Sequence, residues 1–102
     1  MILGYACTIN LRIKNNTDKL IEEIKFTYNE TSIRVKNIKP NENKQTGISN
    51  VYDIKDLKMA VEGLDRAYLI KSEIPKAYVS TIIININSID SDKCEFDIQE
   101  EK

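Results

Sequence analysis

The sequence predicts an all-β protein, an antiparallel β-sandwich of seven to eight strands that forms a single domain over residues 1–102. Apolar and polar residues alternate in short runs along the chain, which is the pattern of strands with one buried face. Clusters of turn-forming residues separate these runs at regular intervals. The length of 102 residues suits one hydrophobic core. A small closed barrel is the alternative architecture.

The first three strands are predicted from apolar residues at every second position. These positions are Ile9, Leu11 and Ile13 in a strand from about Ala6 to Lys14, Ile24, Phe26 and Tyr28 in a strand starting near Leu20, and Ile33, Val35 and Ile38 in a short third strand. Residues 15–18 predict a turn, because Asn and Asp side chains bond the nearby backbone. Leu20, Ile21 and Ile24 also fit a helix, but the β-favouring Phe26-Thr27-Tyr28 run favours a strand.

Proline and glycine delimit the next three strands. The apolar positions are Ile48 and Val51 in a weak fourth strand and Leu57, Met59 and Val61 in a fifth. A sixth strand, from Ala67 to Ile74, has apolar residues on both of its faces. Pro40 turns the chain before the fourth strand, because proline presets a turn dihedral and removes a ladder donor. Gly63 lies in the hairpin after the fifth strand, and Pro75 ends the sixth.

The last two strands complete the predicted sandwich. Their alternating apolar residues are Ile82, Ile84 and Ile86 in the longest strand, Tyr78 to Ile89, and Cys94, Phe96 and Ile98 in the eighth strand. The residues between them, 90–93, predict a turn.

The longest strand has apolar residues on both faces, because Val79 and Ile83 lie on the parity opposite to Ile82 and Ile84. Such a strand is either covered on both sides or presents an apolar patch. A sandwich of this size has no third layer, so we expect Val79 and Ile83 to contact another protein or a second copy of the chain. The alternative is that they are isolated exposed apolar residues, which are common on monomers.

Three segments resemble the turn signals of small immunoglobulin-like sandwich modules of low-GC bacteria. They are Asn15-Asn16-Thr17-Asp18-Lys19, Ile38-Lys39-Pro40-Asn41-Glu42 and Ala77-Tyr78-Val79-Ser80-Thr81-Ile82. Such modules often have Pro-Gly-Glu in the second segment, where Asn41 replaces the glycine at little cost if its backbone is left-handed. The resemblance implies the immunoglobulin-like fold and no catalytic residue or ligand. Isoleucine, lysine and asparagine make up 39 of the 102 residues, which also suggests a bacterial or phage origin.

Charge and composition exclude several functions. Fifteen basic residues oppose 16 acidic ones, so the basic excess of a nucleic-acid-binding protein is missing. The chain has no histidine, which excludes Ser-His and Cys-His nucleophile pairs, and its three glycines do not form a phosphate-binding loop. We therefore expect a protein that is not an enzyme, has no cofactor, and interacts with another protein or with itself.

The alternative function is a small-ligand or carbohydrate-binding module that uses an exposed tyrosine. Tyr52 lies near a predicted loop and is the best candidate for stacking on a ligand. Tyr28, Tyr68 and Tyr78 lie on the apolar parity of their strands, so we expect them at the core or its rim. The absence of tryptophan weakens the carbohydrate-binding alternative.

Carboxylates offer two further kinds of site. Asp53 with Asp56, and Asp90 with Asp92, have the spacing of calcium ligands but lack the rest of a calcium loop, so we expect them to be turn residues. A glycosidase would place two acids across a cleft. The candidate acids are expected on exposed strand faces instead; they are Glu22, Glu23, Glu62 and Glu73.

The two cysteines, Cys7 and Cys94, are predicted to be unpaired, buried thiols. A bridge between them is possible only if the terminal strands are neighbours. The N-terminus has no signal sequence, so the protein is expected in the cytoplasm if Met1 is the native start. No run of apolar residues is long enough to cross a membrane, so we expect no membrane partner.

Overall fold

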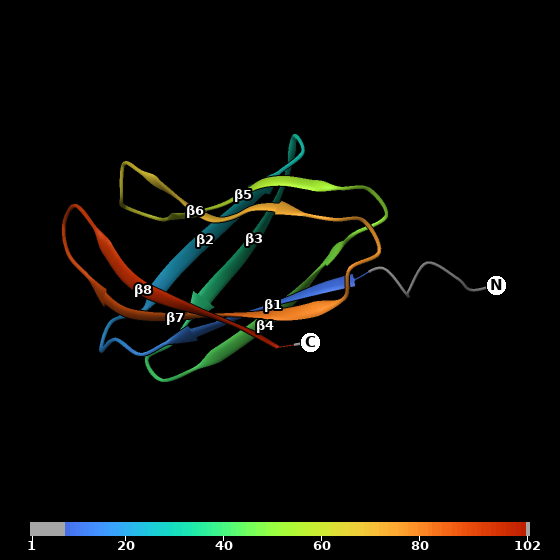
Figure 1. Cartoon of the computed structure of the whole chain (residues 1–102). Coiled ribbons are helices and arrows are strands. Elements are labelled where there is room, and N and C mark those ends of the chain that lie inside the picture. Colours follow the sequence, from blue (N-terminus) through green and yellow to red (C-terminus); the bar gives the residue numbers. More distant parts are fainter. Residues whose placement is uncertain (1–7, 102) are drawn as a thin grey trace.

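The computed structural model describes residues 8–101 and contains two four-stranded sheets packed face to face (Figure 1). Eight strands build these sheets: β1 (Thr8–Asn15), β2 (Ile21–Tyr28), β3 (Thr31–Ile38), β4 (Asn43–Ser49), β5 (Ile54–Val61), β6 (Ala67–Ile74), β7 (Ser80–Ile89) and β8 (Cys94–Glu101). The predicted all-β sandwich is confirmed. In the part of the chain that the structure describes, no helix has the length and apolar character needed to cross a membrane.

The sheets differ in the direction of their strands. Sheet A has the order β4-β1-β7-β8, and sheet B has the order β3-β2-β5-β6. In sheet A, β1 runs parallel to β7, with Ile9 opposite Ser80 and Asn15 opposite Ile86. The predicted purely antiparallel arrangement is therefore wrong for this pair. Alternation of apolar residues is the same in both chain directions, so it shows which face is buried and not which way a strand runs.

The fourth strand lies earlier in the chain than the prediction based on Ile48 and Val51. β4 ends at Ser49, and Val51 lies outside it with 48% of its surface exposed. Among the described strands, it pairs with β1 alone, at the edge of sheet A. Of its inward positions only Ile48 is fully buried, so the rest of the strand remains polar and lacks clear alternation.

The core lies between the two sheets and contains inward-facing residues from all eight strands. Its largest fully buried side chains are Phe26, Ile9, Leu11, Ile13, Ile24, Ile38, Ile48, Ile54, Leu57, Met59, Ile74 and Ile82. Each large aliphatic or aromatic side chain contributes about 1.5–3 kcal/mol when fully buried. In β7, Ile82 and Ile84 are buried and Ile83 is on the outer face, which confirms the predicted parity of this strand.

Asn15, the last residue of β1, fixes the turn that follows it. Its Nδ2 donates hydrogen bonds to the carbonyl oxygens of Lys19 (2.8 Å) and Ile38 (2.9 Å). Its Oδ1 accepts from the backbone N–H (2.9 Å) and the hydroxyl (2.7 Å) of Thr17. The predicted turn is confirmed, but this side chain is fully buried and also ties the turn to the end of β3.

The turn segment before β4, residues 38–42, has the left-handed backbone at Asn41 that would make glycine replaceable there. Asn41 has φ of 65°, in the left-handed region where glycine would be the usual residue. Its N–H donates to the carbonyl oxygen of Asn15 at 2.7 Å. The side chain of Glu42 accepts from the N–H of Lys39 at 2.8 Å, which closes the turn.

Of the two cysteines, Cys94 is a free thiol and lies buried at the start of β8. Burial raises its pKa to about 11, and the nearby Glu95 carboxylate acts in the same direction. This thiol is therefore protonated at neutral pH and is a poor nucleophile. Cys7 lies outside the described residues, so its unpaired state remains a prediction.

Candidate functional site

The candidate site lies at the end of the sandwich where β1 begins and β8 ends, which we call the terminal end (Figure 1). Because the strands alternate in direction, three connections meet there: β2–β3, β4–β5 and β6–β7. The buried Asn50 joins two of them, since its Nδ2 donates to the carbonyl oxygens of Pro75 (3.1 Å) and Tyr78 (2.5 Å). The backbone carbonyl oxygen of Asn50 accepts a hydrogen bond from the N–H of Ala77 at 2.9 Å.

The β2–β3 turn is joined to the β4–β5 connection by side chains. Asn29 and Glu30 have φ of 47° and 64°, as a two-residue hairpin turn requires. Asn29 donates to the carbonyl oxygen of Asp53 (2.7 Å) and accepts from the N–H of Lys55 (3.0 Å). Asp53 in turn accepts from the N–H of Lys76 at 2.8 Å. These bonds hold all three connections of the terminal end in one arrangement.

Asp53 therefore bonds backbone as predicted, although the backbone belongs to another connection and not to its own turn. Its predicted companion Asp56 has φ of 52°, beside a register shift in the pairing of β5 with β6. Among residues 8–101, no group of three or more histidine, cysteine, aspartate or glutamate side chains is placed to hold a metal ion.

Tyr52 lies in the β4–β5 connection and is 77% exposed, which confirms its predicted exposure. It lines a hollow of about 360 Å³, which we call the Tyr52 hollow. The other residues lining it are Tyr28, Asn29, Thr31, Ser49 and Val51. Tyr28 is only partly exposed and packs against the core, as predicted for a residue at the core rim. The hollow thus has one aromatic side chain held by the fold and one that projects from a connection.

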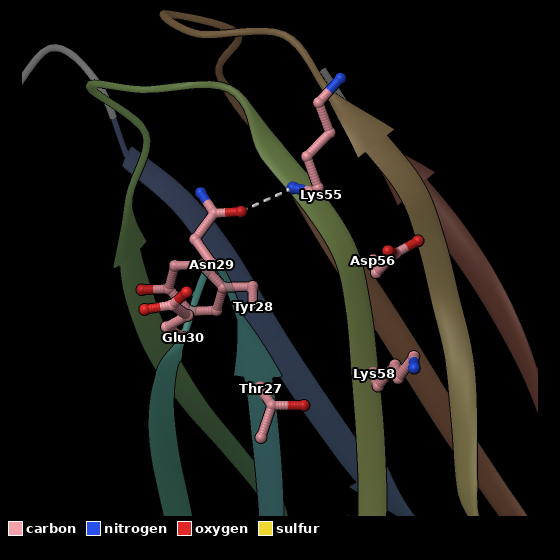
Figure 2. A pocket seen from close by; sticks show the side chains of 7 residues that line it. All are labelled: Thr27, Tyr28, Asn29, Glu30, Lys55, Asp56 and Lys58. Carbon is pink, nitrogen blue, oxygen red and sulfur yellow. Dashed lines mark hydrogen bonds between the residues drawn. The ribbon is translucent and has the colours of Figure 1, made fainter.

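A second hollow, of about 280 Å³, lies between the β2–β3 turn and β5 (Figure 2). It is lined by Thr27, Tyr28, Asn29, Glu30, Lys55, Asp56 and Lys58. Figure 2 shows the Asn29 side chain against the backbone of Lys55, between the turn and β5. Two lysines and two carboxylates line this hollow, so its charges balance and favour neither an anion nor a cation.

One of the two residues predicted to contact a partner, Ile83, lies on the outer face of sheet A. Ile83 lies there between Arg12 of β1 and Gln99 of β8, which are its register partners. Arg12 donates from Nε to Oε1 of Gln45 (3.2 Å), so its aliphatic stem stays over the sheet. Ile83 is therefore half-buried although it points outward, whereas Val79, just before β7, is 54% exposed.

The exposed side chains of Val51, Tyr52 and Val79 lie near the start of β1 at the terminal end. Thr8, the first described residue of β1, is opposite Ser49, and Ile9 is opposite Ser80. Val51 and Tyr52 follow Ser49 closely in the chain, and Val79 directly precedes Ser80. Since the Asn50 side chain bonds Tyr78, these three side chains belong to one end of one sheet.

The acids considered for glycoside hydrolysis lie on exposed faces or at their margins. Glu23 and Glu62 line one hollow of about 260 Å³ on sheet B, together with Lys25 and Arg34. The Glu23 carboxylate pairs with the Arg34 guanidinium at 3.2 Å. Elsewhere, Glu73 pairs with Lys55 at 2.6 Å, and Glu22 is exposed on β2. The structure thus brings Glu62 together with Glu23, beside two cations, and also places Glu62 with Glu22 in another hollow of about 240 Å³.

One cluster that the sequence prediction missed joins the two sheets at their open edge. The Glu100 carboxylate of β8 bonds the Lys71 ammonium at 2.5 Å and the Tyr78 hydroxyl at 2.9 Å. The bond from Lys71, assisted by the one from Tyr78, lowers the pKa of Glu100, although partial burial opposes this. The sequence contained a signal for this cluster, because Glu100 is a charged residue at a position that shares the inward-facing parity of Phe96 and Ile98.

The cluster makes stability depend on pH. The lowered pKa of Glu100 stabilises the fold above the pKa of the unfolded chain, and this contribution is lost as the pH falls through the folded value. We expect Glu100→Gln to lower the free energy of unfolding by about 1 kcal/mol at pH 7 and by less at pH 3, which lies below the ordinary pKa of a glutamate. Urea unfolding at both pH values measures this, with Glu95→Gln on the same strand as the control. An equal loss at both values would contradict the role of the Glu100 charge.

Comparisons with known proteins support the fold alone. The chain is similar to a solved structure described as the NMR structure of the protein from Eubacterium rectale, with a TM-score of 0.53 and 18% sequence identity. The similarity covers 89% of this chain and 87% of that one. No protein-family model and no curated protein matches the sequence.

Proposed function

We propose that this chain is a small protein-interaction module, not an enzyme, that contacts another protein or a second copy through sheet A. The observation that carries the proposal is Ile83, an apolar side chain on the otherwise polar outer face of sheet A, with the exposed Val79 directly before the same strand. Full burial of an exposed side chain of this size contributes about 1.5–3 kcal/mol, and Ile83 and Val79, which are already partly covered, each have about half of that to gain. That strengthens an association tenfold or more without creating it alone.

The fold supports this function in a second way. The terminal end is held by side-chain bonds from Asn29, Asn50 and Asp53, so its exposed side chains are presented on a fixed frame. Little conformational freedom is then lost when a partner binds, which favours affinity. We further propose an immunoglobulin-like module of bacterial or phage origin, on the basis of the three turn segments and the two-sheet architecture.

Ile83→Asp tests the proposed surface. We expect the variant to stay folded, since Ile83 points away from the core, and to lose self-association in sedimentation velocity by at least tenfold. Asn85→Asp, which adds the same charge to the same face, is the control and should change association much less. Unfolding of Ile83→Asp would show that the residue supports the core. A wild type that stays monomeric at all concentrations would exclude the second copy as the partner.

The second candidate function, binding of a small ligand or carbohydrate, rests on the Tyr52 hollow. Its volume of about 360 Å³ lies near the lower limit for small-molecule sites. If it binds sugars, Tyr52→Ala will abolish the NMR shift changes that a panel of oligosaccharides causes in residues 28–31 and 49–52, while Ile83→Asp leaves them unchanged. Absence of shift changes in the wild type would eliminate this candidate.

A further inference from the structure

Within residues 8–101, the C-terminal strand β8 pairs with β7 alone and is therefore an open edge of sheet A. In an edge strand, every second residue directs its N–H and C=O groups away from the sheet. The N–H of Cys94 donates to the Tyr68 hydroxyl of β6 at 2.8 Å, so Cys94 is one of these residues. The alternation then assigns the outward-directed backbone groups to Phe96, Ile98 and Glu100.

The same edge has an acidic row of side chains. The side chains on the outer face of sheet A alternate with the outward-directed backbone groups and are Glu95, Asp97, Gln99 and Glu101, all exposed. Their register partners on β7 are uncharged; for example, Asn85 is opposite Asp97 and Thr81 is opposite Glu101. Glu95 pairs with Lys93 at 3.5 Å, whereas within residues 8–101 no ion pair engages Asp97 or Glu101.

The opposite side of the strand has two apolar residues, Phe96 and Ile98, followed by Glu100, whose carboxylate is engaged by Lys71 and Tyr78. Ile98 is 40% exposed although it faces inward, because no neighbouring strand covers it. Phe96 is more buried and packs edge-on against Tyr68, with ring centroids 5.2 Å apart. A strand added beside β8 would therefore meet carboxylates on one face and the exposed side of Ile98 on the other.

We propose that β8 binds an extended peptide in which basic and apolar residues alternate, and that this peptide adds to sheet A as a fifth strand. Its basic side chains lie beside Asp97 and Glu101, and its apolar side chains cover Ile98. Opposite charges on neighbouring strands stabilise pairing, and the backbone bonds supply the rest of the affinity. The free stretch from Phe96 to Glu101 spans about 20 Å, the usual length of a strand.

A second copy of the chain fits this edge poorly. Two β8 strands side by side would bring their acidic rows together, and like charges across strands are destabilising. The other edge strand of sheet A, β4, has no basic side chain on the outer face, where its residues are Asn43, Gln45, Gly47 and Ser49. The proposal uses the edge of sheet A and neither Val79 nor Ile83, so its failure would leave the proposed function untouched.

The test uses a fluorescent peptide of three Lys-Val repeats with blocked ends. We expect binding in fluorescence anisotropy, together with slowed amide hydrogen exchange at Phe96, Ile98 and Glu100. Asp97→Asn combined with Glu101→Gln should weaken binding about tenfold. The matched control, Glu62→Gln combined with Asp65→Asn in the β5–β6 region, should leave it unchanged.

A second peptide separates strand addition from adsorption by charge. It has the same sequence with alternate backbone nitrogens methylated, so it keeps its charge and loses half of its donors. We expect it to bind at least tenfold more weakly. Equal binding of the two peptides, no binding of the first, or no effect of the charge-removing variant would overturn the proposal. Protection of the same amides by raising the protein concentration alone would overturn it in favour of a second copy.

Discussion

Replacing Phe26 with alanine is expected to lower the free energy of unfolding by about 3–5 kcal/mol. Phe26 is the largest fully buried side chain and lies on β2, a central strand of sheet B, between Ile33 and Met59. The substitution removes its buried apolar surface and leaves a cavity that the two rigid sheets cannot close. A small domain has about 5–15 kcal/mol of stability in total, so the variant should be near the limit of folding.

Urea unfolding followed by circular dichroism measures this loss, and Tyr52→Ala provides the control. Tyr52 is also aromatic but is 77% exposed, so its removal should change stability by no more than about 0.5 kcal/mol. Similar losses for the two variants would contradict the assignment of Phe26 to the core and Tyr52 to the surface.

Replacing Asn15 with alanine is expected to cost about 2–4 kcal/mol, although the residue is polar and small. The substitution leaves the carbonyl oxygens of Ile38 and Lys19 and the N–H of Thr17 without the bonds that the side chain makes. A buried polar group without a partner loses its bonds to water and gains nothing in return. The turn after β1 and the end of β3 should loosen together.

The neighbouring Asn16 supplies the control, because its Nδ2 donates only an exposed bond to Asn87 at 3.1 Å. Asn16→Ala should cost less than about 0.5 kcal/mol in the same thermal or urea unfolding experiment. If the two variants were equally stable, Asn15 would be an ordinary turn residue. Hydrogen exchange at the end of β3 provides a second measurement, since only Asn15→Ala should accelerate it.

The sequence predicted the strands well because most of them have one buried face and one exposed face. The alternation placed Ile82 and Ile84 in the core and Ile83 on the outer face, as the structure confirms. It could not show that β1 and β7 are parallel, because the pattern has no direction. It also misplaced β4, where edge position leaves most residues polar.

The sequence also failed to predict polar contacts between residues far apart in the chain. The Asn-rich turn after β1 was predicted, but the bond from Asn15 to Ile38 joins residues 23 positions apart and depends on how the sheets are stacked. The Glu100 cluster likewise needs β6 and β8 at the same open edge. The exposure of Tyr52 was predicted correctly, because a polar connection without strand alternation places its side chains in solvent.

Photo-crosslinking in cells tests whether the outer face of sheet A contacts a protein partner. A photoreactive phenylalanine analogue replaces Val79 at the terminal end or, as the control, the exposed Arg66 in the connection at the opposite end. We expect one discrete crosslinked product from position 79, none from position 66, and loss of the product when Ile83→Asp is added. No product from position 79, or the same product from both positions, would contradict it.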